Sequence, residues 1–208
     1  MRIWLLARRQ HVLEIVAKEV SERGAIAIPI SCDVANLVDV AQAFGRIGPK
    51  VDVLVNAAAL PAGSVMATDP RQIVRAIEVN LIGTMLCARE SARRMSAGGT
   101  ILNIGSLCVR VRDNGASLYV ATKLGVSGFT DAFRKEMAPR GIRVVLLNPG
   151  QIASGMVTET EAQKRAAVER EAMLTPEEVA EVIRYCVELP ERVVLTEIEL
   201  RPRSQSSL

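Results

Sequence analysis

The stretch MRIWLLARRQHVLEIVAKEVSERGAIAIPI, residues 1–30, contains two short apolar runs joined by an amphipathic segment. The runs at 3–7 and 25–30 are apolar nearly throughout, which is typical of strands buried on both faces of a parallel sheet. Between them apolar residues recur at helical spacing, and Gly24 follows where a helix C-cap belongs. The stretch therefore predicts a β-α-β unit that begins on an interior strand.

The same alternation continues to the end of the chain. It predicts one doubly wound α/β domain over residues 1–208, with a Rossmann-like, mostly parallel sheet. Further strands are expected at 51–56, 100–105, 142–148 and 193–200. The first three of these are also apolar nearly throughout, so burial on both faces is expected for the first five strands of the chain. Further helices are expected from Pro70, after the cap Asp69, at 116–138, and at 176–188 after the cap Thr175.

Composition excludes several classes of function. The net charge is +3 and the basic residues have no interleaved aromatics, so no nucleic-acid partner is expected. A single histidine, His11, and four cysteines without CxxC spacing give no metal site, and they favour reduced thiols. The apolar part of MRIWLLA is shorter than the ~7–15 residues of a signal peptide, and no run approaches the ~18 residues of a membrane span. We therefore expect a cytoplasmic protein without membrane contact.

The segment at about 151–175 departs from the alternation, because it leaves a strand end and becomes a charged, helical excursion. Ligands of open α/β sheets bind beyond the carboxyl ends of the strands. The excursion is therefore placed to cover a substrate site, and a solvated surface helix is the alternative reading.

Tyr119 and Lys123, in SLYVATKLGVSGF (117–129), are four residues apart and share one helix face. A nearby ammonium favours the phenolate, so we expect Lys123 to lower the phenol pKa toward neutrality and to make Tyr119 a proton donor to a carbonyl. Ser106 ends an apolar strand at the edge where ligands bind, and Asn80 lies inside an apolar helix, where a buried amide needs partners.

The motifs VDVLVNAAA, NIGS, YVATK and LLNPG occur in order, each where a strand ends or a helix begins. This ordered set resembles the short-chain dehydrogenase/reductase family. The resemblance implies that Tyr119 is the general acid/base and that Lys123 lowers its pKa and binds the nicotinamide ribose. It further implies that Ser106 holds the reacting oxygen and that Asn80 anchors a water in the proton relay.

The resemblance also assigns the cofactor contacts. The position that is acidic in NAD-specific members is Ala7 here, followed by Arg8 and Arg9, and guanidinium groups suit a 2′-phosphate. NADP(H) is therefore preferred over NAD(H), although both arginines could simply solvate a strand exit. The other implied cofactor contacts are Asp33, Val34, Asn56, Ala57, Tyr119, Lys123, Pro149, Gly150, Ile152 and Ser154.

The sequence departs from the family most strongly at its start. The family begins with a strand, a T-G-x-x-x-G-x-G loop and a helix, and residues 1–9 align with its second strand. Because the loop and the helix N-terminus hold the pyrophosphate, we expect residues 1–208 to bind NADPH too weakly for calorimetry. A start assigned too late, a natural truncation, or direct pairing of 3–7 with 51–56 would each account for this, and we favour the first. A smaller departure is Gly105, where the family often has serine before the catalytic serine, and we expect this change to be neutral.

Two functions are compatible with these residues. The first is an NADP(H)-dependent oxidoreductase that interconverts a carbonyl and an alcohol, as a homodimer or homotetramer. The alternative is a truncated, non-catalytic relative that cannot bind a dinucleotide and acts as a subunit or binding partner. Neither the substrate nor the physiological direction of the reaction is indicated.

Overall fold

Strands alternate with helices along the whole of residues 1–205, the part of the chain that the computed structural model describes. The strands are β1 (Arg2–Ala7), β2 (Ile26–Ser31), β3 (Val53–Asn56), β4 (Thr100–Ile104), β5 (Arg143–Pro149) and β6 (Glu197–Leu200). The helices are α1 (Gln10–Glu22), α2 (Leu37–Ile47), α3 (Pro70–Ile77), α4 (Gly83–Ala92), α5 (Cys108–Val111), α6 (Ser117–Met137), α7 (Glu161–Glu169) and α8 (Pro176–Glu188), with a π-turn η1 (Glu78–Ile82) and a 3₁₀ turn η2 (Ala138–Arg140).

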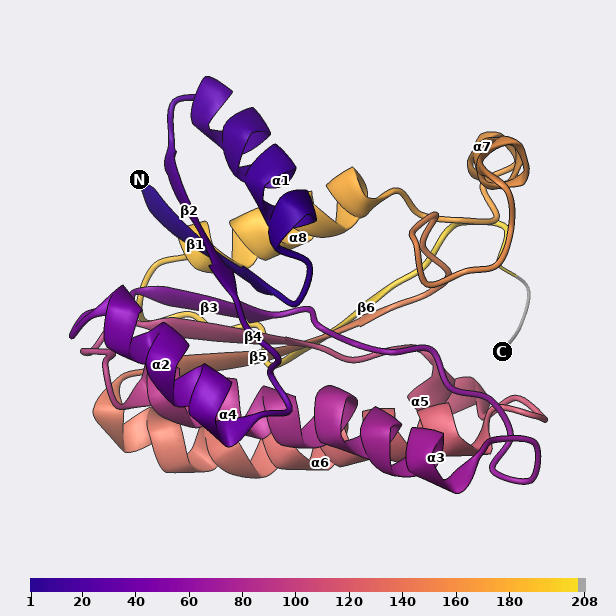
Figure 1. Cartoon of the computed structure of the whole chain (residues 1–208), viewed down its shortest axis with the longest axis horizontal. Coiled ribbons are helices and arrows are strands. Elements are labelled where there is room, and N and C mark those ends of the chain that lie inside the picture. Colours follow the sequence, from indigo (N-terminus) through magenta and orange to yellow (C-terminus); the bar gives the residue numbers. More distant parts are fainter. Residues whose placement is uncertain (206–208) are drawn as a thin grey trace.

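The strands form two parallel sheets rather than one. β1 pairs with β2, and β3, β4, β5 and β6 form a second sheet in that order. No ladder joins β1 to β3 within residues 1–205, so the direct pairing of these strands that the sequence left open does not occur here. The β1–β2 pair instead lies beside β3, the edge strand of the larger sheet (Figure 1).

Helices cover both faces of the larger sheet, as a doubly wound fold requires (Figure 1). On one face α4 and α6 pack against β4 and β5, in a core that contains Ile101, Phe133 and Val144. On the other face α8 packs against β5 and β6 through Cys186 and Val145. The two sheets are joined by side chains rather than by a ladder.

The joint between the sheets is a hydrophobic cluster beneath α2. Trp4 and Leu6 of the small sheet pack with Phe44 of α2 and Leu54 of β3. This cluster holds the end of β1, and the arginines that follow it, on the same edge as the ends of β4 and β5. It therefore fixes the relative position of the two halves of the predicted site.

The sequence predicted most elements to within a few residues. The helix after Thr175 begins at Pro176 with a capping box, in which Thr175 and Glu178 hydrogen-bond each other's main-chain N–H groups. Asp69 caps α3, and Gly24 adopts a left-handed φ of 87° after α1. The helix α2 was not predicted.

Burial on both faces was predicted for the first five strands, and it is wrong for three of them. β4 and β5 are buried almost throughout, but β1 and β2 are only partly covered. In β3, Val53 and Val55 remain about 40% exposed. The reason is that β1, β2 and β3 are edge strands within residues 1–205, whereas β4 and β5 have a neighbouring strand on each side.

In the described part of the chain no helix is both long and apolar enough to cross a bilayer. Over the same residues, histidine, cysteine and acidic side chains do not gather in threes at a distance suited to a metal ion.

Candidate functional site

Ser106, Tyr119 and Lys123 lie together where the ends of β4 and β5 meet the start of α6. Lys123 Nζ lies 5.7 Å from the centroid of the Tyr119 ring and donates a hydrogen bond to the Ile104 carbonyl oxygen at 2.8 Å. The Ser106 hydroxyl lies near the phenol and lowers its pKa. The fold therefore brings together three side chains that are up to 17 residues apart in the sequence.

Burial dominates the protonation of Tyr119. It raises the pKa of the phenol to about 12, with a smaller contribution from Cys108, and the nearby Ser106 hydroxyl opposes the shift only in part. The expectation that Lys123 lowers this pKa toward neutrality is therefore wrong for this structure. The phenol carries its proton at neutral pH, which is the form that a proton donor needs.

Lys123 is buried with more hydrogen-bond donors than acceptors. Burial lowers the pKa of its ammonium to about 8, because a charged group loses its hydration. The ammonium carries three N–H donors, and Ile104 is its one acceptor within residues 1–205. The remaining donors suit hydroxyl groups of a bound molecule, such as a ribose diol.

Asn80 lies in the π-turn η1, which interrupts the helix between α3 and α4. Its Oδ1 accepts the Leu60 N–H at 2.7 Å, and its Nδ2 donates to the Leu60 carbonyl at 3.0 Å and to Thr122 Oγ1 at 3.2 Å. The side chain thus ties the segment after β3 to α6. Single π-turns within helices often mark functional sites, and the water-anchoring role of Asn80 stays a prediction.

Asn56, at the end of β3, points into the fold. Its Nδ2 donates to Asn103 Oδ1 at 2.9 Å and to the Thr84 carbonyl at 3.2 Å. Asn103 in turn donates to Thr130 Oγ1 at 2.9 Å. This chain of buried polar groups fixes the end of β3, and Ala57 follows it at the exposed edge. Asn56 therefore fixes the backbone at the end of β3, and its contact with a cofactor stays a prediction.

Arg8 and Arg9 are exposed immediately after β1, and within residues 1–205 neither is in an ion pair. The Arg8 carbonyl accepts a hydrogen bond from Ser31 Oγ at 3.2 Å, which ties the exit of β1 to the end of β2. The guanidinium groups are therefore available to an anion at this edge.

Asp33 and Val34 follow β2 at the same edge. The Asp33 carboxylate is ion-paired with Arg75 of α3 and accepts the Ala35 N–H at 3.0 Å. Val34 packs so closely on α4 that a Cβ at Gly83 would lie 2.7 Å from its Cγ2. The Asp33 carboxylate is thus already paired within the protein, and Arg75 would compete with a cofactor for it. The sequence did not reveal this competition.

The turn that contains Pro149, Gly150, Ile152 and Ser154 leads into the excursion. Gly150 donates to the Leu200 carbonyl at 2.8 Å, and a bridge between Ile152 and Leu174 closes the base of the excursion. The excursion holds α7 and lies beyond the carboxyl end of β5 (Figure 1). This position suits a segment that covers a substrate site, and that role remains a prediction.

Sequence reasoning missed three polar residues near this site. Asn103, Thr122 and Asn148 are all fully buried. The useful signal was an amide or hydroxyl inside an apolar run, because a buried polar group needs a specific partner. The partners themselves lie on other elements, so the pattern gave no indication of them.

A protein-family model described as short chain dehydrogenase matches residues 1–165. Carbonyl reductase family member 4 of Danio rerio is 34% identical over 203 residues, which cover 89% of this chain and 84% of that protein. The NADP-dependent 3-hydroxy acid dehydrogenase of Schizosaccharomyces pombe is 30% identical over an alignment of 218 positions, gaps included. The alignment covers 99% of this chain and 84% of that protein.

Solved structures give the same result. A short chain dehydrogenase from Burkholderia cenocepacia, crystallised in complex with NADP, has a TM-score of 0.83 and 27% identity, over 97% of this chain and 85% of that one. A short-chain type dehydrogenase/reductase from Mycobacterium marinum has a TM-score of 0.85 and 27% identity, over 97% of this chain and 84% of that one. The predicted Rossmann-like α/β fold is confirmed.

Proposed function

The chain belongs to the short-chain dehydrogenase family, and from this premise we propose that it is an NADP(H)-dependent oxidoreductase that interconverts a carbonyl and an alcohol. The observation that carries the proposal is the grouping of Ser106, Tyr119 and Lys123 at the ends of β4 and β5. The names of two relatives, a carbonyl reductase and an NADP-dependent 3-hydroxy acid dehydrogenase, support the same class of reaction.

The residues present fit NADP(H) at two places. Lys123 has spare buried donors for the nicotinamide ribose, and Arg8 and Arg9 offer exposed guanidinium groups for the 2′-phosphate. The 208-residue sequence contains no glycine-rich loop for the pyrophosphate. We therefore expect the dinucleotide to bind weakly to residues 1–208. Its nicotinamide ribose and its 2′-phosphate should be held better than its pyrophosphate.

When bound, NADPH supplies the hydride to the carbonyl carbon. Tyr119 donates the proton to the carbonyl oxygen, because burial keeps the phenol protonated. Ser106 Oγ accepts the Cys108 N–H at 3.2 Å, so its own O–H can be donated to the same oxygen. The Lys123 ammonium, above the Tyr119 ring, stabilises the phenolate that remains.

The proposal is tested by following NADPH consumption with residues 1–208 at NADPH concentrations up to the millimolar range. The carbonyl probes are a 3-oxo acid, a 3-oxoacyl thioester and an aromatic ketone. Turnover of any of them, above the rate without protein, supports the proposal. Absence of turnover with all three would contradict it for this chain.

A non-catalytic subunit or binding partner is the second candidate. The observation that favours it is the split between the β1–β2 and β3–β6 sheets, which leaves two strand edges open within residues 1–205. Turnover measured at increasing NADPH concentration separates the candidates. A subunit of this kind shows neither turnover nor any saturable NADPH binding, whereas an oxidoreductase with a weak pyrophosphate site shows turnover that rises with NADPH through the millimolar range.

A further inference from the structure

Asn148, at the end of β5, provides the hydrogen-bond acceptor for the main chain of Ser106. Past the end of β4, Gly105 N–H donates to the Leu147 carbonyl at 2.7 Å, and Leu107 N–H donates to the Pro149 carbonyl at 3.0 Å. The Ser106 N–H between them has no main-chain acceptor on β5, and Asn148 Oδ1 accepts it at 3.1 Å. Asn148 is completely buried, so water does not compete for this bond.

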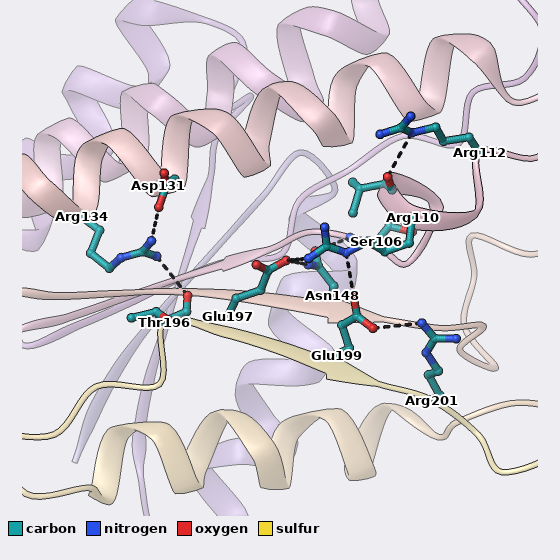
Figure 2. A network of polar contacts seen from close by, with 11 residues as sticks. Ser106, Arg110, Arg112, Asp131, Arg134, Asn148, Thr196, Glu197, Glu199 and Arg201 are labelled. Carbon is teal, nitrogen blue, oxygen red and sulfur yellow. Dashed lines mark hydrogen bonds and ion pairs between the residues drawn. The ribbon is translucent and has the colours of Figure 1, made fainter. Parts of the chain in front are cut away.

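Glu197 fixes which way the Asn148 amide points. Asn148 Nδ2 donates to Glu197 Oε1 on β6 at 2.8 Å (Figure 2). An ion-paired carboxylate only accepts hydrogen bonds, so the NH₂ group must face Glu197 and the oxygen must face Ser106. A flipped amide would turn its donor toward the Ser106 N–H and its acceptor toward the carboxylate, and both bonds would be lost.

Arg110 links Glu197 to the segment that contains Ser106. Its Nη2 donates to Glu197 Oε1 at 2.9 Å, and its Nε donates to Glu199 Oε1 at 2.8 Å (Figure 2). Arg110 lies on the short helix α5, whose Cys108 N–H is held by Ser106 Oγ. Ser106 is therefore held at two atoms: its main-chain N–H by Asn148 on β5, and its Oγ by the Cys108 N–H on α5.

Gly105 has no side chain, and this leaves room for the Asn148 amide. A Cβ at position 105 would lie 2.0 Å from Asn148 Oδ1, a distance at which the amide has to move. The sequence alone predicts that glycine in place of the family's frequent serine is a neutral change. The structure shows instead that any side chain at position 105 competes with Asn148 for one space.

We infer that Asn148 is a positioning residue for Ser106, and that Glu197, anchored by Arg110, sets the orientation of its amide. The inference rests on the proposed function, because Ser106 matters for turnover only if it holds the reacting oxygen. Its role is to keep Ser106 Oγ facing Tyr119, so it affects the chemical step more than the binding of NADPH.

The first test compares Asn148→Ala and Glu197→Gln with the unaltered chain and with Arg134→Gln as a control. Arg134 also contacts this strand region, through the Thr196 carbonyl at 3.2 Å, but it makes no hydrogen bond to Asn148, Glu197 or Arg110. We expect kcat to fall about 10- to 100-fold in Asn148→Ala and by a smaller factor in Glu197→Gln. The apparent NADPH affinity should stay unchanged in both, and Arg134→Gln should keep its kcat.

A second measurement does not depend on turnover. Hydrogen exchange of the Ser106 amide should be at least about tenfold faster in Asn148→Ala, because its acceptor is gone, and unchanged in Arg134→Gln. A residue with a general structural role would speed exchange across β4 and β5 together. Only the specific hydrogen bond predicts a change concentrated at Ser106.

The double variant Gly105→Ala/Asn148→Ala gives the sharpest result. Gly105→Ala alone should resemble Asn148→Ala, because the new methyl displaces the amide. In the Asn148→Ala background the same methyl still meets Leu146 Cδ1 at 3.1 Å, the end of a flexible side chain that can move aside. The second substitution should therefore add only a small factor, roughly two, which is a strongly non-additive cycle.

Three outcomes overturn the inference. Unchanged kcat in Asn148→Ala, with turnover by the unaltered chain, refutes the positioning role and leaves the proposed function intact. Unchanged Ser106 exchange refutes the hydrogen bond on which the role depends. If the unaltered chain turns over no carbonyl probe, the proposed function fails first and the catalytic role of Asn148 fails with it.

Discussion

The ammonium of Lys123 lies over the face of the Tyr119 ring, 5.7 Å from its centroid. The same ammonium is tied to the Ile104 carbonyl, so the two side chains are held together by α6 and by the end of β4. Burial acts on them in opposite directions, raising the pKa of Tyr119 to about 12 and lowering the pKa of Lys123 to about 8. Each shift favours the neutral form.

Lys123 should make stability depend on pH. The pKa of its ammonium is about 8 in the folded chain and 10.5 for a free lysine side chain, so between these values the unfolded state binds more protons. Stability therefore rises with pH across this window, and the gain is lost as pH falls through 8. We expect a difference of about 2 kcal/mol between pH 7 and pH 9.5, measured by urea unfolding relative to Lys123→Met.

Lys135→Met is the matched control for this measurement, since Lys135 lies on the same helix and its side chain is 75% exposed. Its stability profile should run parallel to that of the unaltered chain. Parallel profiles for the unaltered chain and Lys123→Met would show that the ammonium is not desolvated.

Tyr119→Phe should abolish most of the activity without disturbing the fold. Removal of the phenol takes away the proton donor, and general acid catalysis typically contributes about 10²- to 10⁴-fold. Carbonyl reduction measured at saturating probe should fall within this range, while NADPH affinity stays the same.

The second tyrosine of the chain, Tyr185 on α8, supplies the control, because it is 58% exposed and far from the ends of β4 and β5. Tyr185→Phe should keep full activity. Equal rates for the two variants would rule out Tyr119 as the proton donor.

Replacement of Arg8 and Arg9 by alanine should reduce the preference for NADPH over NADH. Each charge-assisted hydrogen bond to a phosphate contributes about 1.5–3 kcal/mol, so the ratio of kcat/KM values for the two dinucleotides should fall by about 10- to 100-fold. The variant Arg23→Ala, at the opposite end of α1, should leave this ratio unchanged. Equal losses with both dinucleotides would argue against recognition of the 2′-phosphate.

Asn80→Ala should destabilise the fold as well as the site. The substitution leaves the Leu60 main chain without its two side-chain partners and empties a buried position. We expect a loss of about 2–3 kcal/mol in the free energy of unfolding, measured by chemical denaturation. Asn114→Ala, at an exposed turn, should change it by less than about 0.5 kcal/mol; a similar cost at both positions would contradict the role of the Asn80 amide.

The sequence was sufficient for the elements that follow a simple period. The apolar run at 142–148 and the capping pattern at Thr175 are local signals, and β5 and α8 lie where these signals predict them. Tyr119 and Lys123 were also accessible, because a spacing of four on a helix fixes a shared face.

Features that depend on contacts between distant elements were not accessible. The role of Asn148 depends on Glu197 and Ser106, which lie on two other segments, and no local pattern records that contact. The pKa of Tyr119 was predicted in the wrong direction because the Lys123 charge is evident in the sequence, whereas the degree of burial is a property of the packed fold.

The break between the two sheets has a consequence for how the protein opens. β1, β2 and α1 share no ladder with β3 in residues 1–205 and are joined to the rest through the side-chain cluster beneath α2. A segment held by packing alone can detach at a lower free energy than the global unfolding transition. We expect the amides of β1 and β2 to exchange as a separate cooperative unit ahead of those of β4 and β5. The arginines that would select the dinucleotide therefore lie on a segment that opens before the strands at whose ends Ser106 and Lys123 are held.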